Sequence, residues 1–309
     1  MSRASIVAML IAAEVLIVGV AVYAVGGGGT TFSSGMHHVD FTPVAQAPVA
    51  AGATPHIVID DAQSRVGVTI SNDGLVHVRD LTELRGAVFS SGSYPQLRVT
   101  RTSDGVHIER PSTGHVSIDI FGYSNERIEV EVPSGARLEI ARCSGADVSG
   151  VTGGVSVRSQ DGHVTLADLQ GSVDAHSSDG YVEAANVRGD RLAMDSDDGH
   201  LSLQNVAVGS LAATTHDGRI TAEGLNLVGA SPSATMHTDD GSIRIHLPPS
   251  ADVNIDASTG DGSIVVDGVS QEGNDSAQRT IRLGAGTAKM TVGTSDGSIH
   301  IYTNGANLQ

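Results

Sequence analysis

The chain has 309 residues, of which 3% are aromatic and 38 are glycine, and its formal net charge is −17. This charge excludes nucleic acid as an expected partner, because contacts with phosphate backbones need clustered Lys and Arg. The apolar residues are mostly Val, Ile, Leu and Ala, which favours a core of thin, repeated layers. The single cysteine, Cys143, excludes an internal disulfide, and we expect it to be a small buried residue.

Residues 1–25 predict a membrane anchor or a signal segment. Ile6 to Val25 is apolar apart from Glu14, and a helix of about 20 residues crosses the ~30 Å core of a bilayer. Arg3 precedes this run, so the positive-inside bias predicts a single-pass protein with a cytoplasmic N-terminus and an extracytoplasmic main domain, periplasmic or at the cell surface. The alternative is a signal peptide cleaved after Ala24, which would make the protein secreted.

Glu14 is unusual within a membrane span, because a carboxylate in hydrocarbon is costly. It is either tolerated among its apolar neighbours or contacts another membrane protein. Residues 26–55 are rich first in Gly and Ser and then in Pro and Ala, which predicts a linker that spaces the following domain, residues 56–309, from the membrane.

The domain carries an internal repeat marked by Asp-Gly pairs at intervals of 18, 19, 19, 23 and 21 residues. Each pair precedes aliphatic residues two positions apart, a period that predicts strands with one buried face. In the first unit we expect Val164 and Leu166 to point inward and Thr165 outward. The same inward places are taken in the next three units by Val182 and Ala184, Leu201 and Leu203, and Ile220 and Ala222. The pairs begin at Asp161, Asp179, Asp198, Asp217, Asp240 and Asp261.

Units of 18–23 residues with two short strands each predict an all-β, single-domain β-solenoid, in which each layer packs on the next. An antiparallel meander with Asp-Gly hairpins is the competing interpretation. The pattern recurs upstream at residues 72–78 and 103–108, and residues 297–302 form a final strand. The least regular segment, Thr82 to Gln96, is expected to form a loop or cap.

Two further segments carry a distinctive pattern. EVEVPSGARLEI at Glu129–Ile140 and RIHLPPSADVNI at Arg244–Ile255 each join two alternating strands through proline and small residues. Over residues 56–302 the chain resembles a bacterial family of unknown function whose members are named putative adhesins. The resemblance implies a β-solenoid or β-roll outside the cytoplasm, often tethered, and it implies no catalytic or binding residues. This chain departs from the family in having Asp-Gly where Ser-Gly-Asp is commoner.

If the units stack, the aspartates of the six Asp-Gly pairs form a line of carboxylates. Ca²⁺ is the one cofactor that this line could bind, since hard cations take several carboxylate oxygens. However, the calcium-binding nonapeptide pattern is missing, and Asp also favours solvated turns. The six aspartates are therefore weak metal candidates, and otherwise we expect no cofactor.

The thirteen histidines raise the question of a transition metal. His163 and His200 hold the same place in two units, but Tyr181 stands between them and separates them by about 10 Å. Two ligands of one Zn²⁺ each lie about 2 Å from the metal, so this pair is too far apart. Other histidines fall at different offsets from their turns and are expected to be scattered over the surface: His176, His216 and His237.

These patterns favour a non-enzymatic, adhesin-like or structural module of the cell envelope, with an envelope protein or a surface polymer as partner. A polar lattice would face that partner from the outward residues Thr165, Glu183, Ser202 and Thr221. The alternative is an envelope stress sensor or a regulatory partner of a membrane protein. A carbohydrate-active β-helix enzyme is the third interpretation. Carboxylate pairs are abundant enough for hydrolysis, but they recur in every unit, and the sequence has no nucleophile elbow, phosphate-binding loop or zinc-protease motif.

Overall fold

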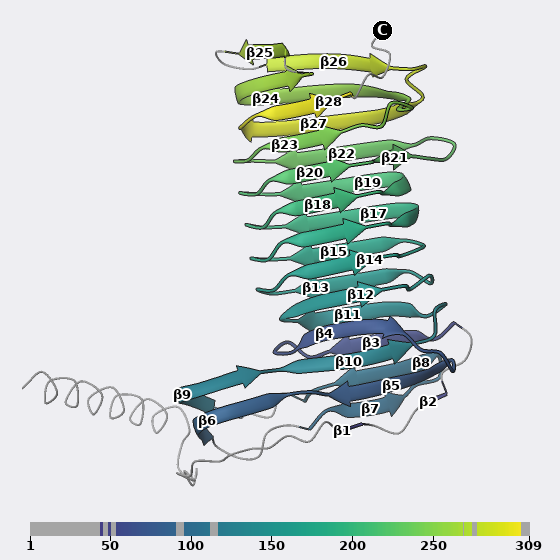
Figure 1. Cartoon of the computed structure of the whole chain (residues 1–309), viewed down its shortest axis with the longest axis vertical. Coiled ribbons are helices and arrows are strands. Elements are labelled where there is room, and N and C mark those ends of the chain that lie inside the picture. Colours follow the sequence, from purple (N-terminus) through teal and green to yellow (C-terminus); the bar gives the residue numbers. More distant parts are fainter. Residues whose placement is uncertain are drawn as a thin grey trace, which may run out of the picture. The chain divides into compact units, whose positions relative to one another are not determined.

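The computed structural model describes residues 44–45, 49–50, 54–90, 96–111, 117–267, 269–273 and 277–303. The regular elements in these ranges are strands, numbered β1 to β28 (Figure 1). The chain divides into a smaller unit, residues 1–39, 85–95 and 112–123, and a larger unit, residues 40–84, 96–111 and 124–309.

The predicted anchor, residues 1–25, lies outside the described residues, as does most of the linker at residues 26–55. Among the residues that are described, no helix is long and apolar enough to cross a membrane. The anchor, its orientation and the cleavage after Ala24 therefore stay predictions.

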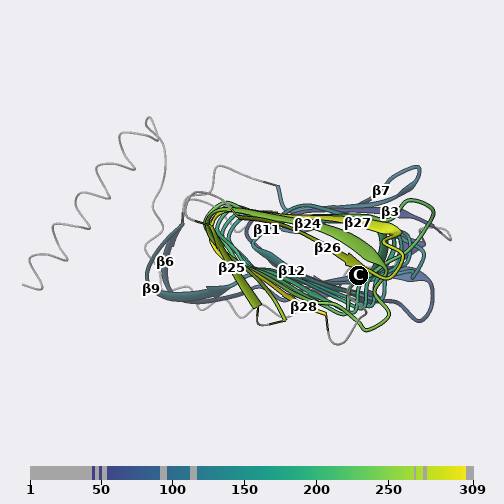
Figure 2. The ribbon, with the colours of Figure 1, turned by 90° about the horizontal axis from the view of Figure 1, so that it is seen from above.

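The larger unit is a stack of coils in which each coil contributes one strand to each of two faces. Viewed along the stack, the two faces lie opposite each other, with β11 and β27 on one side and β12 and β28 on the other (Figure 2). The first face runs, in spatial order, through β7 (Arg98–Arg101), β8 (Gly105–Glu109), β3 (His56–Asp60), β11 (Arg137–Cys143), β13 (Val155–Ser159), β15 (Val173–Ser177), β17 (Arg188–Ser196), β19 (Ala207–Thr215), β22 (Ser233–Thr238), β27 (Ala288–Asp296), β24 (Val253–Val266) and β26 (Ala277–Leu283).

The second face is built in the same way, and the second half of the long strand β24 is its last strand but one. Its strands are, in spatial order, β5 (Leu75–Asp80), β10 (Arg127–Val132), β4 (Arg65–Ile70), β12 (Gly145–Ser149), β14 (Val164–Ala167), β16 (Val182–Ala185), β18 (Leu201–Gln204), β20 (Ile220–Glu223), β23 (Ile243–His246), β28 (Ile299–Tyr302), β24 and β25 (Val269–Gly273). Three short strands lie beside these faces: β1 (Val44–Ala45) and β2 (Val49–Ala50) on β5, and β21 (Asn226–Leu227) on β19.

The strands of the repeat region pair parallel and in register, which confirms the solenoid and excludes the antiparallel meander there. On the second face Val164 lies beside Val182, Val182 beside Leu201, and Leu201 beside Ile220. Like residues therefore stack on like residues from layer to layer, as the repeat predicted.

The core is a continuous column of aliphatic side chains between the two faces. Val164 and Leu166 are fully buried while Thr165 between them is not, so the predicted inward and outward sides are correct. Burying one Val, Leu or Ile contributes about 1.5–3 kcal/mol, and the column repeats this in every layer. Cys143 is a free, buried thiol, as expected, and burial raises its pKa, which makes it a poor nucleophile at neutral pH.

The chain does not fill the stack in sequence order. Near its start, β3 lies between β8 and β11 on the first face, and β4 lies between β10 and β12 on the second. Near its end, β27 lies between β22 and β24, and β28 lies between β23 and β24. Each terminal coil thus occupies a layer that the rest of the chain leaves open.

At each of the two proline-containing segments the chain skips a layer. One connects β10 to β11 past the layer of β3 and β4, and the other connects β23 to β24 past the layer of β27 and β28. In both, the proline carbonyl accepts a bond from the alanine three residues on, Pro133 from Ala136 at 2.9 Å and Pro248 from Ala251 at 3.0 Å. Proline has no N–H, so it interrupts the ladder, and the short turn redirects the chain.

One segment that was expected to form a loop or cap contains a strand and not a loop. Part of the segment Thr82 to Gln96 forms the strand β6 (Glu83–Ser90), which pairs with β9 (Ser117–Asn125) in a separate two-stranded sheet. Because β6 pairs with β9 and not with a strand of a neighbouring coil, its segment does not need the Asp-Gly turn of the repeat. Strand formation here depends on that distant partner, which local patterns do not reveal.

Truncation of the chain tests whether β27 and β28 fill the layer between β22 and β23 on one side and β24 on the other. A chain that ends at Gly286 lacks β27 and β28, so the facing edges of β22, β23 and β24 lose their backbone partners. We expect its thermal transition, followed by circular dichroism, to broaden and fall to lower temperature. A peptide of residues 287–303 added in trans should restore the transition, because it supplies both missing strands.

A matched peptide with Ile299→Asp and Ile301→Asp should restore nothing, because both isoleucines are fully buried. A truncated chain that melts like the intact chain would contradict the assignment of this layer.

Candidate functional site

Turns of the sequence Ser/Thr-x-Asp-Gly connect the first face to the second and lie above one another; we call this line the Asp-Gly edge. Each turn bonds through its backbone to the turn of the preceding layer, as Asp198 N does to Ser178 O at 3.1 Å. The described turns are, in spatial order, Ser159–Gly162, Ser177–Gly180, Ser196–Gly199, Thr215–Gly218, Thr238–Gly241, Thr294–Gly297 and Thr259–Gly262.

A buried hydroxyl ties each turn to its neighbour. Ser196 Oγ donates to the carbonyl of Gly180 in the preceding layer at 3.1 Å and accepts from the N–H of Gly199 in its own turn at 3.0 Å. A Cβ on Gly199 would lie 1.9 Å from that same Gly180 carbonyl, so the close approach of two layers requires glycine. The hydroxyl and the glycine together explain the recurring motif.

The six aspartates predicted as metal candidates all lie on this edge, and all are exposed to solvent. The six keep their predicted order, but a seventh aspartate, Asp296, lies between Asp240 and Asp261, and Asp261 pairs directly with Asp296. Sequence spacing missed this neighbour since the turn of Asp296 belongs to the inserted terminal coil. Among the residues that the structure describes, no group of three or more His, Cys, Asp or Glu side chains is arranged to hold a metal ion. Calcium binding at this edge stays a prediction.

The histidines are partly paired along the same side of the stack. The ring of His163 stacks on Tyr181 with 3.7 Å between centroids, as their equivalent places in adjacent units imply. His216 and His237 both contact Asp239, at 3.2 Å and 3.0 Å, which their different offsets from the turns did not predict.

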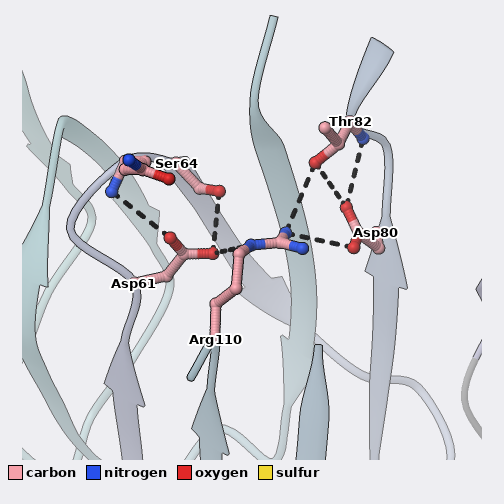
Figure 3. Close-up of polar contacts among 6 residues, drawn as sticks. Asp61, Ser64, Asp80, Thr82 and Arg110 are labelled. Carbon is pink, nitrogen blue, oxygen red and sulfur yellow. Dashed lines mark hydrogen bonds and ion pairs between the residues drawn. The ribbon is translucent and has the colours of Figure 1, made fainter. Parts of the chain in front are cut away.

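A buried ionic cluster lies at the end of the inserted first coil (Figure 3). The guanidinium of Arg110 lies between two carboxylates, with Nε 2.7 Å from Asp61 and Nη2 3.0 Å from Asp80. The Arg110 and Asp61 side chains are 3% and 2% exposed. Ser64 donates to Asp61 at 2.8 Å, and Thr82 donates to Asp80 at 2.6 Å, so both carboxylates have further partners.

This cluster joins three segments that are distant in the sequence: the turn after β3, the end of β5 and the residue after β8. Its burial keeps it from substrates, and its position fixes the inserted coil of β3 and β4 against its neighbours. The cluster cannot be predicted from the sequence, because nothing near Arg110 in the chain indicates that two distant aspartates converge on it.

A family model described as Toastrack DUF4097 matches residues 55–302. The chain belongs to this family. The match confirms the resemblance to a bacterial family of unknown function, and the Toastrack domain is a β-solenoid, as the fold of the larger unit shows.

Two solved structures are similar to the Toastrack domain at a distance. One is described as a "putative cell adhesion protein" from Clostridium sporogenes ATCC 15579, with 12% identity, a TM-score of 0.25, and coverage of 84% of this chain and 99% of that chain. The other is described as a "putative adhesin" from Bacteroides fragilis NCTC 9343, with 12% identity, a TM-score of 0.39, and coverage of 86% of this chain and 100% of that chain. No curated protein matches the chain.

The hydroxyl ladder of the Toastrack domain is tested at Ser196. Ser196→Ala leaves the Gly180 carbonyl and the Gly199 N–H buried without their partner, and we expect it to lower the free energy of unfolding in urea by about 1–3 kcal/mol. The matched variant Ser196→Thr keeps the hydroxyl and should unfold like wild type, because Thr215 holds the same place in the next layer. Equal losses in the two variants would show that the hydroxyl bond is not the cause.

The buried cluster is tested at Arg110. Arg110→Met leaves the buried carboxylates of Asp61 and Asp80 without their cation, so we expect a loss of about 3–5 kcal/mol in the free energy of unfolding. The control, Arg142→Met, removes an exposed pair with Asp60 and should cost at most about 1 kcal/mol. Similar urea midpoints for the two variants would contradict a structural role for the cluster.

Proposed function

We propose that this Toastrack domain is a non-enzymatic, adhesin-like interaction module, held outside the cytoplasm by the N-terminal segment. The observation that carries the proposal is the Asp-Gly edge, where the same exposed carboxylate recurs in the seven successive turns from Ser159–Gly162 to Thr259–Gly262. Such a surface suits a partner that is itself repetitive, such as a surface polymer or an array of envelope proteins, because each layer adds an equivalent contact.

The outward residues of the second face support the same proposal. Thr165 lies beside Glu183, Glu183 beside Ser202 and Ser202 beside Thr221, all in register and all partly exposed. An acid–base enzyme needs a carboxylate pair whose surroundings differ from those of other pairs, whereas the described turns of the Asp-Gly edge expose their carboxylates alike.

The proposed location outside the cytoplasm depends on residues 1–25. Their apolar run and the preceding Arg3 favour export, and the linker at residues 26–55 would space the domain from the membrane.

Stepwise replacement of the edge carboxylates tests the repetitive surface. Asp179→Asn, Asp198→Asn and Asp217→Asn keep the shape of the turns and remove one charge each. We expect attachment of cells that display the domain to fall progressively as the three changes are combined. Complete loss from one change, with no effect of the other two, would indicate a single site and would contradict the proposal.

Protease accessibility of a C-terminally tagged chain tests whether the domain lies outside the cytoplasm. We expect cleavage either in intact cells or after the outer envelope is permeabilised, with the cytoplasmic membrane still sealed. Protection until the cytoplasmic membrane itself is opened would overturn an extracytoplasmic domain.

A further inference from the structure

The outer side of the second face has a gap at Gly67 of β4. Gly67 lies in register between Glu129 of β10 and Asp147 of β12, whose side chains rise on either side of it. A Cβ built on Gly67 would meet no atom closer than 3.7 Å, in contrast to Gly199, where the nearest atom lies at 1.9 Å. Neither packing nor backbone conformation therefore requires glycine at this place. A glycine inside a strand marks a bulge, a tight bend, or the close approach of a ligand or of another backbone, and no backbone atom of another described strand lies within 3.7 Å of the Cβ built on Gly67.

The gap opens a hollow of about 320 Å³. Its lining includes Gly67 and Val68 together with the charged side chains Arg79, Arg127, Glu129 and Asp147. This volume is at the small end of the range for ligand sites, so it suits a small molecule or one terminal group of a larger one.

Most charges around the hollow are firmly paired. Arg65 donates two bonds to the carboxylate of Asp147, at 2.8 Å and 2.7 Å, and this contact lowers the pKa of Asp147 and raises that of Arg65. Arg79 contacts Glu131 at 3.0 Å.

Arg127 and Glu129 are held more loosely. Their mutual contact is 3.4 Å long, and the other contact of Glu129, with Arg79, is 3.3 Å long. The Nε of Arg127 is buried and has no hydrogen-bond partner, and its Nη2 lies 3.8 Å from the place where a Cβ on Gly67 would be. The Nη2 of Arg127 lies beside the hollow and can donate hydrogen bonds to an anionic group, and the loosely held carboxylate of Glu129 next to it can accept them from a cationic group.

We propose that the hollow over Gly67 binds a small zwitterion of about dipeptide size, whose carboxylate is bound by Arg127 and whose ammonium group is bound by Glu129. The two charges of such a ligand would replace the 3.4 Å contact between Arg127 and Glu129 with two direct ion pairs. The inference goes beyond the proposed function, because it concerns a different surface from the Asp-Gly edge and holds wherever the domain is located.

The test is a titration of the purified full chain with the dipeptide Ala-Ala by isothermal titration calorimetry. Two blocked probes divide the contributions: acetyl-Ala-Ala lacks the ammonium group, and Ala-Ala amide lacks the carboxylate. We expect saturable binding of Ala-Ala at millimolar concentrations and a loss of roughly tenfold or more for either blocked probe. Binding of acetyl-Ala-Ala as tight as that of Ala-Ala would overturn the zwitterion, and no binding of any probe would overturn the site.

Variants of the chain separate the site from the fold. Gly67→Val fills the hollow while favouring the strand, so it should abolish binding without lowering the melting temperature. Arg127→Gln should weaken binding by roughly tenfold or more. The matched control is Arg244→Gln, since Arg244 lies on the same face, on β23, and also has a buried Nε without a partner. Unchanged binding in Gly67→Val, or equal weakening in the Arg127 and Arg244 variants, would overturn the proposal.

Discussion

In-register stacking of one coil on the next is the constraint on which the larger unit depends. In a parallel stack the backbone groups of each layer bond to the layers on either side. Every coil must therefore place its turns directly above the turns of the coil before it. At the Asp-Gly edge this stacking leaves room for no residue larger than glycine. The buried hydroxyl of Ser or Thr then accepts a hydrogen bond from the glycine N–H, which the tight turn leaves without a backbone partner. The repeat in the sequence follows from this one requirement.

The same requirement explains which parts of the fold the sequence predicts. Layers that follow one another in the chain repeat the same spacing, so Val164 and Leu166 could be assigned to the core from their pattern alone. The inserted coils are different, because their neighbours in space are remote in the chain. His56 of β3 pairs with Arg137 of β11, and no local pattern indicates such a partner. The proline segments were recognisable as unusual, but only the pairing of strands shows that each one skips a layer.

Sites within the repeat could be predicted from the sequence, whereas sites that involve the inserted coils could not. The repeat placed the aspartates of the Asp-Gly edge correctly on one side of the stack, yet it missed Asp296, which enters from the terminal coil. The buried cluster around Arg110 and the hollow over Gly67 both combine segments that the first coil brings together by insertion. Neither could be read from spacing, because each depends on which strand fills the open layer.

The inserted terminal coils also decide how the stack responds to tension. A strand on the outside of a stack has one neighbour, and a pull along the chain can peel it away bond by bond. Both β3 and β28 have a neighbour on each side. A pull from the C-terminal side must therefore shear the two ladders of β28 at the same time, and a pull from the N-terminal side meets the two ladders of β3 once the short strands β1 and β2 have separated from β5. Forced unfolding is governed by the height of its barrier and not by equilibrium stability. The order of the layers therefore gives the domain resistance to mechanical load at the points where force enters it.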